Sequence, residues 1–289
     1  MSSQPNGQDA DKLQIYLLPN LMTAGNLFCG FVALTKIVEA DINQPTFNSI
    51  IRNALFFIFM ACIFDVLDGR VARMGGSESP FGRQFDSLAD LISFGAAPAF
   101  LVHRIVLRDV VVQHAEVGWF IASIYLICGA LRLARFNCLA TMPGVKQDKD
   151  FLGLPIPAAA GLVASLTLLI MWVEDRDFAK GNWRYILPVI LVFLSIMMIS
   201  EVKYPSFKKM DLRAKRPFLK LVGAILFIGL LLVLRNKILP FVLPTLFSAY
   251  LIYGFVRPRI SRRMRMEIED GGDDDEDESD RAADGSGKR

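Results

Sequence analysis

The chain has 289 residues, of which 53% are hydrophobic and 21% are charged, and its formal net charge is +3. This hydrophobic share exceeds the ~45–50% of ordinary soluble domains. The apolar residues also gather in blocks of about 17–25 residues, which are long enough to cross a hydrocarbon core of about 30 Å. These properties exclude an ordinary soluble domain and indicate a membrane protein.

Eight apolar blocks follow one another along the chain. Because unpaired backbone polar groups are costly in lipid, we expect each block to form a helix. The sequence therefore predicts an all-α integral membrane bundle of about eight transmembrane helices, with six or seven as alternatives. The blocks are residues 17–39, 50–73, 83–106, 116–138, 152–173, 183–200, 219–235 and 238–256.

Lys and Arg residues are concentrated in alternate connections between the blocks. The positive-inside tendency assigns this richer side to the cytoplasm, so both termini are predicted to be cytoplasmic and the chain to lie in the inner or plasma membrane. Membrane lipids, and no nucleic acid, are the expected partners of this basic face. Residues 1–12 and the basic, then acidic, tail 261–289 are predicted to be disordered, which leaves 13–260 for the transmembrane domain.

Four aspartates lie at the end of the second block and the start of the third. Asp65 and Asp68 are three residues apart, and Asp86 and Asp90 are four apart, so each pair shares one face of its helix. The short link makes the two helices antiparallel neighbours, and the four carboxylates are expected to converge near the cytoplasmic membrane surface. Such carboxylates repel one another unless cations neutralise them. Oxygen ligands favour Mg²⁺ or Mn²⁺.

The residues around these aspartates favour phosphoryl transfer. Four carboxylates suit a pair of ions about 3.5–4 Å apart, which can clamp a phosphate. Gly69 and Ala72 leave room for a nucleotide or a neighbouring helix, and Arg73 offers a planar donor for a diphosphate. Taken singly, an intramembrane Asp can instead serve a proton relay or a transporter, and a Gly/Ala pair usually serves packing.

The string D-x2-D-G-x2-A-R-x8-G-x3-D-x3-D, from Asp65 to Asp90, resembles the signature of the CDP-alcohol phosphatidyltransferase family at every position. The resemblance implies the fold of that family and a catalytic transmembrane domain that transfers a phosphatidyl or similar group from a CDP-linked donor to an alcohol, with release of CMP. It also implies that the four aspartates bind metal and that Asp90 takes the proton of the alcohol. The donor would contact Asn26, Gly69, Ala72, Arg73 and Gly82.

Five further segments resemble the membrane-integral phosphatidylserine synthases of this family. They are residues 18–33, 93–100, 129–137, 151–161 and 202–209. This likeness implies CDP-diacylglycerol as the donor and L-serine as the acceptor. Arg132 and Arg135 offer cations for the serine carboxylate, although both could be topology anchors. The "YPSFKK" segment, with Tyr204 and Lys209, is a second candidate for the acceptor pocket.

Three alternatives stay open at this point. The same enzyme class could use another acceptor, such as glycerol 3-phosphate or inositol phosphate. An ion-coupled transporter would use intramembrane aspartates without producing CMP, and a lipid-scaffolding protein would use only the basic face. Small residues in the third to fifth blocks indicate close helix packing, and we expect a homodimer.

Overall fold

The computed structural model describes residues 17–75, 79–107, 115–141, 150–175, 185–205, 238–254 and 256. For residues 17–19, 70–75, 107, 115, 141, 150–151, 203 and 205 it describes the backbone alone. In this part of the chain, five helical segments are long and apolar enough to cross a membrane. They are Asn20–Glu39, Phe47–Gly69, Pro80–Val106, Glu116–Ala140 and Ile156–Glu174. Two shorter apolar helices are Ile186–Ile199 and Leu239–Gly254. The predicted block 219–235 and the predicted disordered ends, 1–12 and 261–289, lie outside the described residues, so the count of eight stays a prediction.

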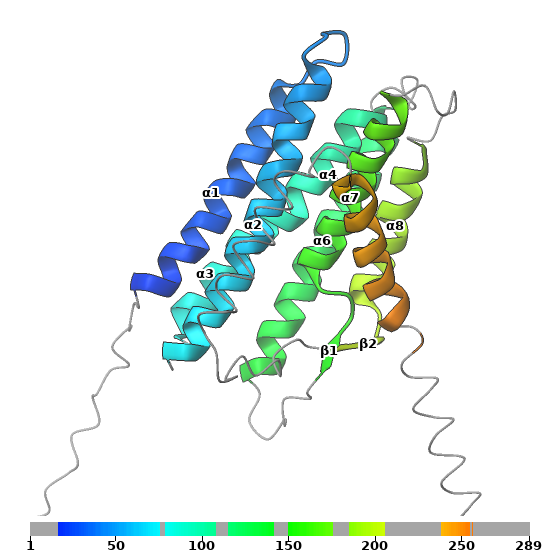
Figure 1. The fold of residues 1–289 in the computed structure, drawn as a ribbon. Coiled ribbons are helices and arrows are strands. Elements are labelled where there is room, and N and C mark those ends of the chain that lie inside the picture. Colours follow the sequence, from blue (N-terminus) through cyan, green and yellow to red (C-terminus); the bar gives the residue numbers. More distant parts are fainter. Residues whose placement is uncertain are drawn as a thin grey trace, which may run out of the picture.

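The helices lie side by side along one axis (Figure 1). We call the end with the α1–α2 connection the turn end, and the end with the two strands the ribbon end. The start of α1 and the end of the helix Leu239–Gly254 both lie at the ribbon end (Figure 1). The elements are α1 (Leu17–Glu39), α2 (Phe47–Gly75), α3 (Pro80–Asp90), η1 (Leu91–Ala96), α4 (Ala97–Val102), η2 (His103–Leu107), α6 (Ala115–Thr141), β1 (Asp150–Leu152), α7 (Ile156–Glu174), α8 (Ile186–Ile199) and β2 (Lys203–Pro205).

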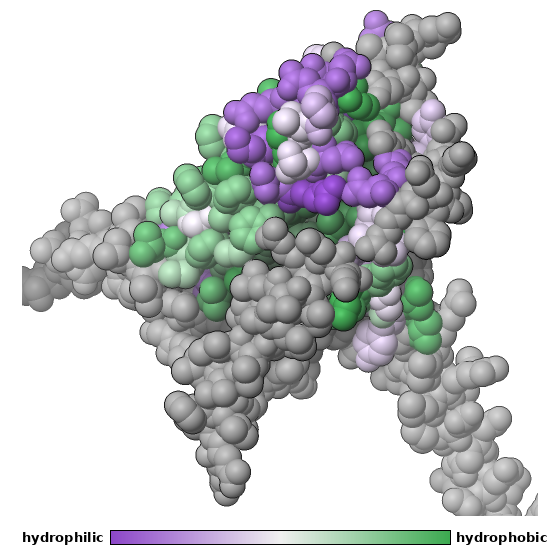
Figure 2. Space-filling view, turned by 45° about the horizontal axis from the view of Figure 1, so that its top comes forward, coloured by the Kyte–Doolittle hydropathy of each residue, from purple (hydrophilic) through white to green (hydrophobic). Residues whose placement is uncertain are grey.

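The outer surface suits a lipid environment. Large apolar side chains such as Phe28, Trp119 and Val189 are more than 60% exposed, at 63%, 67% and 68%. Figure 2, which brings the turn end forward, shows a hydrophilic patch beside hydrophobic flanks. At this end the Arg52 Nη2 atom lies 2.6 Å from Asp175 Oδ2. Apolar flanks between polar ends are typical of a membrane protein.

The third predicted block is a helix with two wide π-helical turns, η1 and η2. Pro98 lies just after η1 and has no N–H for the Phe94 carbonyl four residues earlier. The buried Tyr125 hydroxyl of α6 donates to that carbonyl instead, at 3.2 Å. Tyr125 thus satisfies the carbonyl that Pro98 leaves without a helical partner. The first wide turn begins directly after Asp90, and such turns often mark functional sites.

A short two-stranded ribbon is an addition to the predicted all-α fold. β1 pairs antiparallel with β2, and Phe151 lies opposite Tyr204. The fifth helix therefore begins at Ile156, not at residue 152 as predicted, because residues 150–152 pair with a strand. Pro157 lies in the first turn of this helix, where its missing N–H costs no helical hydrogen bond. The ribbon lies at the same end of the bundle as the start of α3 (Figure 1).

Candidate active site

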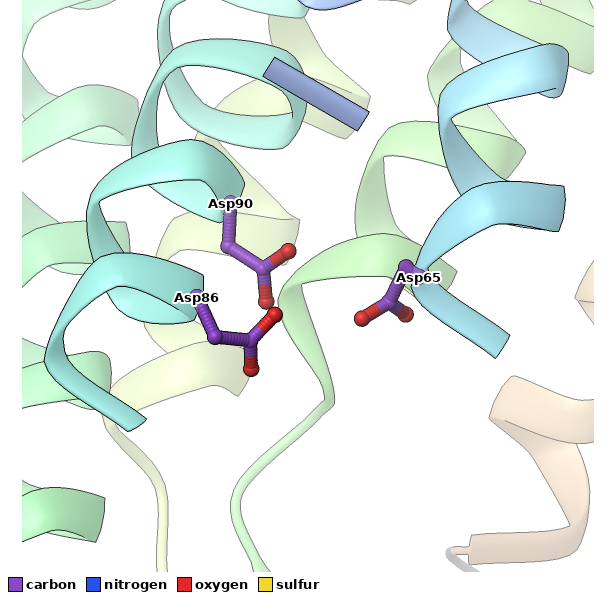
Figure 3. Close-up of side chains that lie close together, drawn as sticks. All are labelled: Asp65, Asp86 and Asp90. Carbon is purple, nitrogen blue, oxygen red and sulfur yellow. The ribbon is translucent and has the colours of Figure 1, made fainter. Parts of the chain in front are cut away.

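Three of the four predicted aspartates meet between two helices. Asp65 comes from α2, and Asp86 and Asp90 come from α3, with one carboxylate oxygen of each within 4.8 Å of those of the others. Their side chains point toward one another across the gap between the helices (Figure 3). Asp90 is buried, whereas Asp65 and Asp86 are partly buried. The antiparallel helices thus produce the convergence that the sequence spacing predicts.

The fourth aspartate lies outside this group. Asp68 follows Asp65 by one turn of α2 and is buried, and its carboxylate accepts a hydrogen bond from the Thr23 hydroxyl of α1. This contact satisfies the carboxylate on the side facing α1. The predicted meeting of all four aspartates is therefore seen for three of them, because a tertiary partner holds the fourth.

Helix α1 forms a polar wall of the site. The Asn26 Nδ2 atom donates to Asp90 Oδ1 at 2.9 Å, and the Ser93 hydroxyl donates to the backbone carbonyl of Asn26 at 3.0 Å. A Cβ atom at Gly30 would lie 2.7 Å from the Ser93 Cα atom, so glycine allows α1 to approach η1 this closely. The sequence predicts that Asn26 contacts the donor. In the structure its amide holds Asp90.

Thr23 and Ser93 are site residues that the sequence reasoning missed. Thr23 precedes Asn26 by three residues, so the two side chains lie on one face of α1. That spacing was visible in the sequence. The partners of these residues were not, because Asp68 and Asp90 come from other helices.

The two predicted serine-binding arginines have different surroundings. Arg132 is buried with 7% exposure, its charge acts on Asp90 and Asp65, and its guanidinium carbon lies 5.8 Å from the centre of the Phe136 ring. Arg135 instead donates to backbone carbonyls at the end of α8, including that of Ile199 at 2.9 Å. Arg132 therefore lies beside the aspartates, whereas Arg135 caps a helix end.

The other residues predicted to bind the donor lie near the ends of α2 and α3. Gly82 is in the first turn of α3, and its N–H donates to the Ser79 hydroxyl at 3.0 Å. Gly69 lies near the end of α2 and is partly buried. Ala72 and Arg73 lie on α2, but their side chains are outside the described part, and Lys209 is entirely outside the described residues.

The grouped carboxylates are compatible with a divalent metal. Two unit charges 4.8 Å apart repel by about 3 kcal/mol at an effective dielectric constant near 20. Three such charges are therefore unfavourable together unless a cation compensates them. The donor set consists only of oxygen atoms, which suits Mg²⁺ or Mn²⁺. The buried Asn26 Oδ1 atom, which has no hydrogen-bond partner among the described residues, adds a further acceptor beside Asp90.

Replacing Thr23 by Val should lower activity by about tenfold, because Asp68 would lose a hydrogen bond to its charged group. Initial rates under saturating substrates would measure this change. Thr35→Val is the matched control, since Thr35 lies on the same helix and its hydroxyl donates to the Val32 carbonyl of its own helix. Equal rates for the two variants would show that the Thr23 contact with Asp68 does not support catalysis.

The chain is similar in sequence to a known family of enzymes and to several named proteins. A family model for CDP-alcohol phosphatidyltransferase matches residues 16–198. A Helicobacter pylori protein named CDP-diacylglycerol–serine O-phosphatidyltransferase is 34% identical over 243 residues, which cover 84% of this chain and 91% of that protein. A Bacillus subtilis protein of the same name is 32% identical over 194 residues, or 66% of this chain and 92% of that protein. A Methanocaldococcus jannaschii protein of this name is 36% identical over 159 residues, which cover 55% of this chain and 67% of that protein.

Proposed function

The chain belongs to the CDP-alcohol phosphatidyltransferase family, and we propose that it transfers the phosphatidyl group of CDP-diacylglycerol to the hydroxyl of L-serine, with release of CMP. The similar proteins from Helicobacter pylori and Bacillus subtilis, most of whose lengths are matched, carry the name of this reaction. Because the family consists of enzymes, the transporter and scaffold alternatives are set aside. No feature of the described residues favours glycerol 3-phosphate or inositol phosphate over serine.

The observation that carries the proposal is the meeting of three carboxylates from two neighbouring helices. We propose that Asp65, Asp86 and Asp90, together with Asp68, hold two Mg²⁺ or Mn²⁺ ions. When bound, these ions neutralise the diphosphate of the donor and the charge that develops around phosphorus. The close approach of these carboxylates and the donor set of oxygen atoms alone support this assignment.

Asp90 is the proposed general base. The serine oxygen attacks phosphorus, the bond from phosphorus to the CMP oxygen breaks, and the serine proton passes to Asp90. Asn26 holds one oxygen of this carboxylate at 2.9 Å, so the group is oriented before the substrate arrives. A base of this kind must reach the proton directly or through one water.

The donor would enter the site from the lipid. We propose that its two acyl chains remain between helices while the diphosphate and cytidine lie near Asn26, Gly69, Ala72, Arg73 and Gly82. The ribbon end would then face the cytoplasm, where serine is dissolved, and the membrane would be the inner or plasma membrane. The basic connections predicted on this side support that orientation. The homodimer stays a prediction from the small residues of the helices.

An acceptor screen tests the proposed function. Purified protein in detergent, supplied with CDP-diacylglycerol and Mn²⁺, should release CMP and form a lipid product with L-serine. Reactions without acceptor, or with glycerol 3-phosphate or inositol phosphate, should stay at background. Lipid formation with one of these phosphorylated alcohols and none with serine would contradict the assignment of the acceptor.

A further inference from the structure

The phenol of Tyr204 is fully buried, and none of the described residues forms a hydrogen bond with it. Tyr204 of β2 has 0% exposure, and its hydroxyl has no partner in the part of the chain that the structure describes. A buried hydroxyl left unsatisfied costs about 1–3 kcal/mol. Among the described residues nothing pairs with this hydroxyl, so it is available to donate a hydrogen bond to a ligand.

The position of this phenol is fixed by the last described helix. The Tyr204 ring lies 5.7 Å from the Tyr250 ring, with 35° between their planes. A Cβ atom at Gly254 would collide with the Tyr204 ring, so this glycine lets the ring pack against the helix backbone. Tyr204 and Tyr250 therefore form one pair on two elements that are distant in sequence.

This tyrosine pair continues into the aspartate group through Arg132. The Tyr250 hydroxyl lies within electrostatic range of both the Tyr204 hydroxyl and the Arg132 guanidinium. Arg132 interacts in the same way with Asp90 and Asp65. Among the described residues, Arg132 and the two phenols thus form a series that leads to the aspartates. Such a set suits an anion that must be held next to the reacting hydroxyl.

Arg135 holds the ribbon that carries Tyr204. Its Nη2 atom donates to the carbonyls of Leu152 at 3.2 Å and Ser200 at 3.3 Å, which joins β1 to the end of α8. Gly153 follows β1 with a φ of 78°, in the left-handed region, and a Cβ atom there would lie 2.9 Å from Arg135 Nη2. Arg135 therefore acts as a positioning residue, and of the two arginines only Arg132 lies beside the site.

We infer that Tyr204 and Tyr250, together with Arg132, bind the carboxylate of an amino-acid acceptor and so determine which alcohol reacts. This inference rests on the proposed function. A carboxylate accepts several hydrogen bonds, a guanidinium can satisfy two of them, and phenol hydroxyls can donate others. Burial raises the pKa of Tyr204 to about 12, so its hydroxyl carries its proton at neutral pH.

Tyr204→Phe and Tyr250→Phe test this inference because each removes one oxygen and keeps the packed ring. The KM for L-serine should rise about tenfold, as expected for the loss of a hydrogen bond to a charged group. The KM for CDP-diacylglycerol should stay constant. The inhibition constant of serinol, which has the serine hydroxyl and amine but no carboxylate, should also stay constant. Tyr253→Phe is the matched control, since Tyr253 lies on the same helix with 52% exposure.

Two results would overturn the inference while wild-type protein converts L-serine. One is an unchanged KM for serine in both variants. The other is a parallel rise in the serinol inhibition constant, which would show that the phenols do not contact the carboxylate. Thermal melting identifies a variant that has not folded, and the other variant then decides the result. If the wild-type protein forms no lipid product with L-serine, the proposed function itself is overturned.

Discussion

The Asp90→Asn variant is expected to transfer phosphatidyl groups about 10²–10⁴-fold more slowly than the wild type, while it still binds CDP-diacylglycerol. The amide keeps the shape of the side chain and can still contact Asn26, but it cannot accept the serine proton. Because Asp90 is buried and belongs to the acidic group, the substitution also removes one charge from the proposed metal site. Both effects act on the chemical step.

The rate of CMP release with saturating serine measures this loss, and retention of labelled CDP-diacylglycerol measures donor binding. Asp175→Asn is the matched control, because Asp175 pairs with Arg52 at the turn end, far from the ribbon end. This control should retain wild-type turnover. Near-normal turnover in Asp90→Asn would remove Asp90 from the role of base.

Removal of divalent cations is expected to reduce transfer by at least about 100-fold. Without them, the three carboxylates would face the diphosphate of the donor, so negative charges would repel one another throughout the site. Chelation with EDTA followed by a CMP assay measures the loss, and added Mg²⁺ or Mn²⁺ should restore the activity. Thermal melting of the metal-depleted protein serves as the control for folding. Full activity in protein shown by elemental analysis to be metal-free would exclude a role for divalent ions.

The positions of Asp65, Asp86 and Asp90 show which contacts can be predicted from sequence spacing and which cannot. Pairs of aspartates three and four residues apart must share a helix face, and a short connection must place the two helices side by side. These local rules are sufficient to predict that Asp65, Asp86 and Asp90 meet. They do not predict that Asp68 turns toward Thr23, because that contact joins residues 45 positions apart.

Arg132 and Arg135 show that residue type and spacing alone cannot assign a role to each arginine. Arg132 and Arg135 are three residues apart, and both could serve serine or the membrane surface. The structure separates them because the end of α8 leaves carbonyls without helical partners, and Arg135 reaches these carbonyls from α6. The ribbon was missed for a similar reason. Three-residue strands carry no periodic signal, and β1 and β2 lie about 50 residues apart in the sequence.

The central claim is that the aspartates of α2 and α3 bind divalent cations. Titration of the purified, metal-free protein with Mn²⁺, followed by electron paramagnetic resonance of the free ion, tests it most directly. We expect about two bound ions per chain. Binding should weaken in Asp65→Asn and Asp86→Asn and persist in Asp175→Asn. Wild-type protein that leaves all the Mn²⁺ free, or binding that is equal in all these variants, would contradict the claim.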